Sequence, residues 1–107
     1  MIICAGSIFT DYISRIDKFP KKPIKVLSRG IDKRLGGSEA VSAFTAKILG
    51  YNSKFIGKFG DDDSSVFLKN EFKKFSINIT KSVFIKKCQS SQSFVIEDTK
   101  GERLLAA

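Results

Sequence analysis

The chain has 107 residues, of which 42% are hydrophobic and 28% are charged, enough for one folded domain with a buried core. No apolar run approaches the roughly 20 residues that cross a bilayer, and the start lacks the basic segment of a signal peptide. We therefore expect a cytoplasmic protein with no membrane segment.

The formal net charge of +8 raises the question of nucleic-acid binding. Nucleic-acid interfaces gather Lys and Arg in one place to neutralise phosphates. Here the cations are spread along the chain, and Lys far outnumbers Arg. We therefore favour a solvated basic surface over a nucleic-acid interface.

The chain contains no histidine and two cysteines, Cys4 and Cys88. The cysteines lack the spacing of a zinc site, and we expect both to be buried thiols. Without histidine, neither a Ser-His-Asp nor a Cys-His mechanism fits this chain, which leaves a carboxylate or a lysine as the base.

The first third of the sequence predicts three strands. Residues 2–9 form an apolar run that contains Gly6, a pattern typical of a buried strand in the middle of a sheet. Residues 12–17 and 24–35 alternate between apolar and polar side chains, as half-exposed strands do, and two prolines within 19–23 separate them. We expect these two strands to stand off the first one as a flap.

Two helices follow. The first is expected to begin at Ser38 as its N-cap and to end at Gly50, with an apolar stripe formed by Val41, Phe44 and Ile48. The second is expected after the turn at 60–63, capped by Asp63 or Ser64, with an apolar stripe formed by Leu68, Phe72 and Phe75.

Short strands are expected at 54–57, 83–86 and 93–97, with a turn at 98–101 leading into 103–105. This order predicts an α/β core with right-handed crossovers and an attached β flap. The last residues, 104–107, read as the middle of a strand, so we expect a truncated domain.

Gly36, Gly37 and Ser38 stand at the expected start of the first helix. Free backbone N–H groups and the positive end of the helix dipole bind hydroxyls or anions there, and glycine allows a ligand close to the backbone. The alternative is a tight turn between strand and helix. The spacing matches neither of the common glycine-rich nucleotide motifs.

Two acidic features are candidates for chemistry. Asp11 follows the first strand, where open α/β sheets meet their ligands, and its carboxylate can accept two hydrogen bonds from neighbouring sugar hydroxyls; a solvated turn is the alternative. The run 61–63 could suggest a metal site, but consecutive side chains point apart, which favours a turn and helix cap.

Taken in order, three segments resemble the first signature region of the ribokinase-like (PfkB-type) carbohydrate kinases. They are Gly6-Ser7-Ile8 with Asp11, Gly36-Gly37-Ser38 with Ala40, Ala43, Leu49 and Gly50, and Phe55-Ile56-Gly57-Lys58-Phe59-Gly60-Asp61-Asp62. Residues 90–93 and 98–103 resemble more particularly the branch of 6-deoxy-6-sulfofructose kinases, in which Lys25 and Arg29 match basic flap positions.

The resemblance implies a partial Rossmann-like αβα core with a β-sheet lid over the sugar, formed by about 12–35 and 83–105, with the C-terminal half missing. It implies that Asp11, Gly36, Gly37 and Ser38 bind sugar hydroxyls, and that Lys25, with Arg29, reaches an anionic tail on the sugar. Three positions depart from the family pattern. Val41 stands where many members have an asparagine near the sugar, Phe9 where some members have a second asparagine, and Ser65 where glycine is common. These departures disfavour ribose and adenosine as substrates.

The resemblance also implies ATP and Mg as cofactors, held mainly by a missing C-terminal segment that carries an anion hole and an aspartate base. We expect the chain to be the sugar-binding portion of an ATP-dependent kinase and to be inactive alone. The alternative is a non-catalytic binding or dimerisation module derived from the lid. A homodimer through the lid is compatible with either reading.

Overall fold

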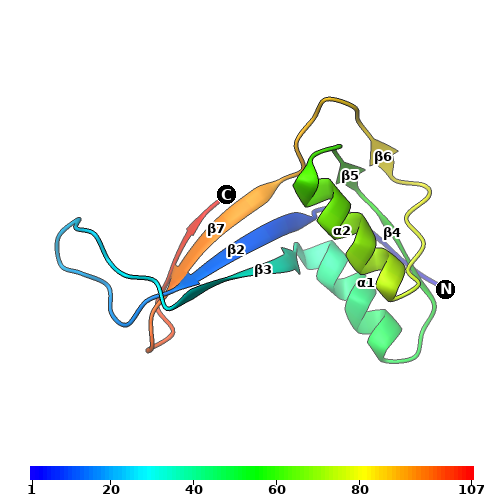
Figure 1. Ribbon diagram of the computed structural model, residues 1–107. Helices are drawn as coiled ribbons and strands as arrows, with labels where there is room; N and C mark the ends of the chain where they lie inside the picture. The colour runs from blue at the N-terminus through cyan, green and yellow to red at the C-terminus, as the bar shows by residue number, and fades with distance from the viewer.

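The computed structural model describes residues 1–107, which form three sheets and two helices (Figure 1). Along the chain the elements are β1 (Ile2–Ala5), β2 (Phe9–Arg15), β3 (Gly30–Gly36), α1 (Ser38–Ile48), β4 (Ser53–Ile56), β5 (Lys58–Phe59), α2 (Asp63–Lys74), β6 (Val83–Phe84), β7 (Gln92–Glu97) and β8 (Arg103–Ala106). The predicted α/β class and the predicted strands in the second half are confirmed. Neither helix has the length and apolar character needed to span a lipid bilayer.

The largest sheet has four strands in the order β3-β2-β7-β8 and projects away from the helices (Figure 1). β2 is antiparallel to β3 and parallel to β7, and β8 returns antiparallel along β7. β2 begins three residues earlier than predicted, and β3 begins only at Gly30. Residues 17–29 form a loop instead of a strand, because the two prolines at 20 and 23 break regular pairing.

The strand register assigns each side chain of this sheet to one of two faces. Residues paired directly across strands share a face, and neighbours along a strand alternate. One face, here called the Asp11 face, carries Asp11, Ile13, Arg15, Asp32, Arg34, Ser93, Val95, Glu97, Arg103 and Leu105. The opposite one, called the Tyr12 face, carries Tyr12, Ser14, Ile31, Lys33, Phe94, Ile96 and Leu104.

The predicted long central strand is wrong. The chain turns at Gly6, whose φ of 149° favours glycine, so residues 2–9 divide between β1 and β2 in different sheets. β1 pairs in parallel with β4 along one edge only, and most of its residues are exposed.

Helix α1 lies on β1 and β4 through small residues. Ala40, Ala43 and Ala46 are buried, whereas Val41 and Ile48 of the predicted stripe are 47% and 70% exposed. That part of the prediction is wrong, because the inner face of a closely packed helix needs small side chains. The N-cap is Gly37 rather than Ser38, which is the first helical residue.

Helix α2 completes the core. Its N-cap is Asp62, one residue before the two predicted candidates, and Leu68 and Phe72 are fully buried as predicted. The Phe72 ring stacks on that of Phe55, with centroids 5.0 Å apart, and contacts the ring of Phe59 edge-on at 5.9 Å.

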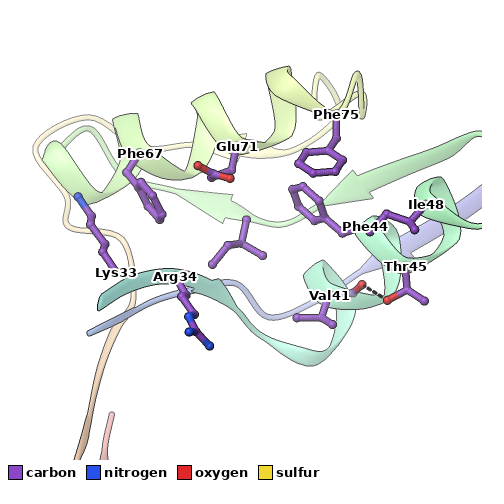
Figure 2. Close-up of a pocket in the computed structure, with 10 residues that line it drawn as sticks. Lys33, Arg34, Val41, Phe44, Thr45, Ile48, Phe67, Glu71 and Phe75 are labelled. Atoms are coloured by element: carbon purple, nitrogen blue, oxygen red, sulfur yellow. Dashed lines mark hydrogen bonds between the residues drawn. The ribbon is translucent and has the colours of Figure 1, made fainter. Parts of the chain in front are cut away.

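The ring of Phe44 from α1 meets that of Phe75, the C-cap residue of α2, edge-on, with 5.1 Å between centroids (Figure 2). Phe75 therefore belongs to the helix–helix contact but remains partly exposed.

Cys4 and Cys88 are only partly buried, which contradicts the expected buried thiols. Neither cysteine is in a disulfide.

The aromatic cluster generates a stability prediction. We expect Phe72→Ala to lower the free energy of unfolding by about 3–5 kcal/mol, since a buried ring is replaced by a cavity. Val66→Ala, at an exposed position of the same helix, should change it by less than about 0.5 kcal/mol. Urea denaturation followed by circular dichroism measures both, and equal effects would contradict the assignment of Phe72 to the core.

Candidate functional site

The candidate site lies where β2, the end of β3 and the start of α1 meet. The Asp11 carboxylate of β2 lies directly over Gly36: a Cβ at Gly36 would be 2.1 Å from Asp11 Oδ2. Any side chain at 36 would therefore displace the carboxylate. The other oxygen, Oδ1, accepts a hydrogen bond from Ser93 Oγ on β7. The structure thus brings together Asp11 and Gly36, both predicted site residues.

Gly37 makes the turn into α1. Its φ is 101°, and a Cβ there would lie 2.5 Å from the carbonyl oxygen of Ser7. Both the backbone conformation and the close approach require glycine. The first backbone N–H groups of α1, which begins at Ser38, have no partner within the helix and lie at the positive end of its dipole.

A second carboxylate fixes the loop between β1 and β2. Glu39, in the first turn of α1, accepts hydrogen bonds from the Ser7 backbone N–H at 3.0 Å and from Ser7 Oγ at 2.6 Å. The Ser7 hydroxyl, followed by backbone N–H groups, holds the pKa of Glu39 below its ordinary value. Gly6 makes room for this contact, because a Cβ there would lie 2.6 Å from the Glu39 side chain.

These elements enclose a cavity of about 260 Å³, lined by Ser7, Phe9, Asp11, Gly37, Ser38, Ser93, Leu105 and Ala107. The hydroxyl protons of Ser7 and Ser93 are committed to Glu39 and Asp11, so both serine oxygens face a ligand as acceptors. Asp11 Oδ2 adds a charged acceptor. Acceptors thus dominate the side chains of the cavity, which suits a ligand that presents several hydroxyl donors.

Sequence reasoning did not assign Ser7 or Ser93 to the site. Ser93 is 82 residues from Asp11, and only the parallel pairing of β2 with β7 brings the two together. For Ser7 a signal existed, since it directly follows the first strand beside Gly6. Its acceptor role depends on Glu39, which the sequence places only in the first turn of a helix.

Lys25 and Arg29 lie outside this cavity, in the loop 17–29 at the far end of the four-stranded sheet (Figure 1). Arg29 Nε forms an exposed ion pair with Asp17 Oδ1 at 2.5 Å. Gly30, which follows it, pairs with Arg15, four positions along β2 from Asp11 and hence roughly 13 Å away. Lys25 lies further along the loop. The structure therefore does not bring these two cations together with Asp11.

The acidic turn before α2 binds backbone and hydroxyl groups of the protein itself. Asp61 accepts from the N–H groups of Lys87 at 2.7 Å and Cys88 at 3.1 Å, which lower its pKa. Burial raises the pKa of Asp62, but hydrogen bonds from the Ser65 hydroxyl and from the N–H groups of Ser90 and Ser65 outweigh it, and the net pKa is lowered. This is the predicted turn and helix cap.

The chain can be placed among known proteins by its sequence and its fold. All of the chain, residues 1–107, matches the model of the pfkB family of carbohydrate kinases. The chain belongs to this family. The resemblance predicted from the sequence is thereby confirmed at the level of the family, and the ribokinase-type fold with it.

The relatives include kinases named for different substrates. The nucleoside kinase of Methanocaldococcus jannaschii is 26% identical over 103 residues, and its crystal structure superposes with a TM-score of 0.82 over 98% of this chain and 35% of that one. Fructokinase-2 of Zea mays is 37% identical over 76 residues, 71% of this chain and 23% of the relative. Arabidopsis thaliana ribokinase, solved with ribose and ATP, has a TM-score of 0.78 at 18% identity, over 98% of this chain and 34% of that one. The pfkB chain thus spans about a third or less of each relative.

The bonded carboxylates generate a pH prediction. The pKa values of Glu39, Asp61 and Asp62 are lowered by folding, so their stabilisation is complete above the ordinary carboxylate range, about pH 4, and is lost as pH falls through the folded values. We expect the free energy of unfolding to be level from about pH 5 to 7 and to decline below about pH 4.

Urea titrations across this pH range measure the decline. The Asp61→Asn variant, which removes one of the three titrating groups, should be less stable at neutral pH and should show a shallower decline in acid. A decline as steep as that of the unsubstituted chain would contradict the assignment of Asp61.

Proposed function

We propose that the natural protein carrying this chain is an ATP-dependent carbohydrate kinase, and that these 107 residues hold the sugar that receives the γ-phosphate. The acceptor-rich cavity is the observation that supports this. In this proposal Asp11 accepts hydrogen bonds from sugar hydroxyls, the serine oxygens accept others, and the N–H groups at the start of α1 donate to a sugar oxygen. Together these groups orient a polyhydroxylated ligand.

ATP and Mg are proposed as cofactors of the natural protein on the strength of its family. The residues of this chain do not fit Mg-ATP. No group of three or more acidic, histidine or cysteine side chains is placed to hold a metal ion. The carboxylates of Asp61 and Asp62 are already engaged by N–H and hydroxyl groups. We therefore assign the cofactors mainly to the part of the protein outside these residues, and expect no phosphoryl transfer by the chain alone.

We assign the lid to residues 12–35 and 83–105, so that the whole chain is the N-terminal portion of one kinase domain. These ranges contain most of the four-stranded sheet, whose β2 and β7 carry Asp11 and Ser93 into the cavity. A lid of this kind excludes water from the sugar and covers it with the Asp11 face.

For the substrate we propose a sugar with an acidic tail, such as 6-deoxy-6-sulfofructose. The motif at 98–103 and the flap cations Lys25 and Arg29 support this through their resemblance to that branch. Phe9, an apolar residue that lines the cavity, narrows the choice of sugar further, because it offers no hydrogen bond where some members have an amide.

A binding or dimerisation module remains the second candidate, and one observation favours a dimer in either case. The Tyr12 face carries Ile31, Phe94 and Leu104, three exposed apolar side chains on neighbouring or nearby strands of one sheet. An exposed apolar sheet face of this kind is typical of an association surface. We propose that a second copy covers it.

The sugar-binding role rests on Asp11. We expect Asp11→Asn to weaken the binding of D-fructose by about 10- to 100-fold, because charge-assisted hydrogen bonds to hydroxyls become neutral ones. Asp17→Asn, an exposed aspartate outside the cavity, should leave the affinity unchanged. Isothermal titration calorimetry on the natural protein measures both. Unaltered binding by Asp11→Asn would overturn the proposed site.

The dimer has its own test. Ile31→Asp places a charge at a 68% exposed position of the Tyr12 face and should convert dimers to monomers in sedimentation velocity runs. Ile24→Asp is the matched control, because Ile24 is 67% exposed but lies in the loop 17–29. A monomeric unsubstituted protein, or equal effects of the two substitutions, would sink the proposed interface.

A further inference from the structure

We infer that Arg34 is a specificity-determining residue, which binds an anionic substituent of the sugar while Asp11 binds a hydroxyl of the same molecule. This rests on the proposed sugar-binding function and assigns the anion to a residue of β3 that is distinct from the flap cations. The ligand class is a sugar that carries a phosphate, sulfonate or carboxylate group.

The register of β2 and β3 places Arg34 beside the site. Asp11 and Arg34 are directly paired across the two antiparallel strands, so both side chains leave the Asp11 face, with Cβ atoms roughly 5 Å apart. The Asp11 carboxylate leans towards Gly36. Figure 2 shows Arg34 pointing away from Lys33 and Phe67, which lie on the other side of β3.

The Arg34 guanidinium keeps most of its donors free. Its one ion pair is a 3.4 Å contact from Nη2 to Asp32 Oδ2, and its side chain is 59% exposed. Asp32 is already engaged by Arg15 through a much closer contact. The open cavity of about 390 Å³ that Arg34 borders lies on the opposite side of β3, where Lys33 and Phe67 line it, and the Arg34 side chain points away from that cavity (Figure 2).

The Asp11 face carries three arginines and three carboxylates, but Asp11 takes no part in the ion pairs, so the arginines share the other two carboxylates. Arg15 and Arg103 both contact Glu97, at 3.1 and 3.5 Å, and Arg15 and Arg34 share Asp32. Three guanidinium groups therefore face two carboxylates in this network. Of the three, Arg34 is the one directly opposite Asp11.

Asp11 and Arg34 form no ion pair with each other, although they are cross-strand neighbours of opposite charge. A ligand with a hydroxyl donor at one end and an anionic acceptor at the other can therefore contact both without breaking an existing bond. The planar fork of arginine suits such an anion, because it donates two parallel hydrogen bonds.

The test compares a neutral and an anionic sugar. The natural protein that carries this chain is titrated calorimetrically with D-fructose, D-fructose 6-phosphate and inorganic phosphate at neutral pH. We expect the sugar phosphate to bind about tenfold more tightly than fructose. Arg34→Gln should abolish that preference without changing the affinity for fructose, and Arg34→Lys, which keeps the charge but not the fork, should retain part of it.

Lys21→Gln and Lys22→Gln, which change exposed lysines of the loop 17–29, are the matched controls and should keep the full preference, and circular dichroism checks that each variant is folded. If fructose binds and the preference survives in Arg34→Gln, or disappears in either control, the proposed function stands and this inference fails. If inorganic phosphate binds as tightly as the sugar phosphate, Arg34 serves an anion site independent of sugar, which also overturns it. If neither sugar binds, the proposed function fails, and this inference, which rests on it, fails with it.

Discussion

The close approach of three backbone segments at Gly36 and Gly37 determines the rest of the site. The Asp11 carboxylate and the Ser7 carbonyl occupy the space that two Cβ atoms would otherwise fill. Since β3 ends at Gly36 and α1 begins at Ser38, this contact fixes the helix start against β2. The N–H groups of the helix and the carboxylate of the strand are then adjacent, which neither element achieves alone. Gly36 and Gly37 contribute to the site by leaving space for the Asp11 carboxylate and the Ser7 carbonyl.

A second junction holds the four-stranded sheet against α2. Ser64, at the start of that helix, meets the Tyr12 hydroxyl at 3.1 Å and accepts a hydrogen bond from Gln92 Nε2 at 2.9 Å. Asp62 caps the same helix and also accepts from the Ser90 N–H, just before β7. Because β2 and β7 carry Asp11 and Ser93, this polar junction sets the angle at which those groups enter the cavity. Leu68 and Phe72 of α2 are fully buried in the core, which anchors that helix in turn.

Local chemistry made part of this architecture predictable from the sequence. Both helices and a pair of strands within 12–35 follow from glycine, capping and alternation patterns, whereas Asp11, expected after the first strand, lies within β2. The misses share a cause: they depend on partners distant in sequence. Ser7 lies 32 residues from Glu39, and Ser93 lies 82 from Asp11. The predicted apolar stripe of α1 is also wrong. Ala40, Ala43 and Ala46 recur at helical spacing just as the larger apolar residues of the helix do, so periodicity alone does not say which set is buried. Close packing of the helix against the strands favours the alanines.

The charge distribution of this basic protein gives the site a direction. Two of its eleven acidic residues, Asp11 and Glu39, lie at or beside the cavity, and Arg34 is the cation directly opposite Asp11, whereas Lys25 and Arg29 lie at the far end of the sheet. On the proposed function, an anionic group is repelled by these carboxylates and attracted by Arg34, so a sugar with one charged end would bind with its neutral hydroxyls towards Asp11. A ligand without charge has no such preference and is oriented by hydrogen bonds alone. If these residues hold a sugar as proposed, selection between sugars depends on where the charge sits on the ligand as much as on how many hydroxyls it carries.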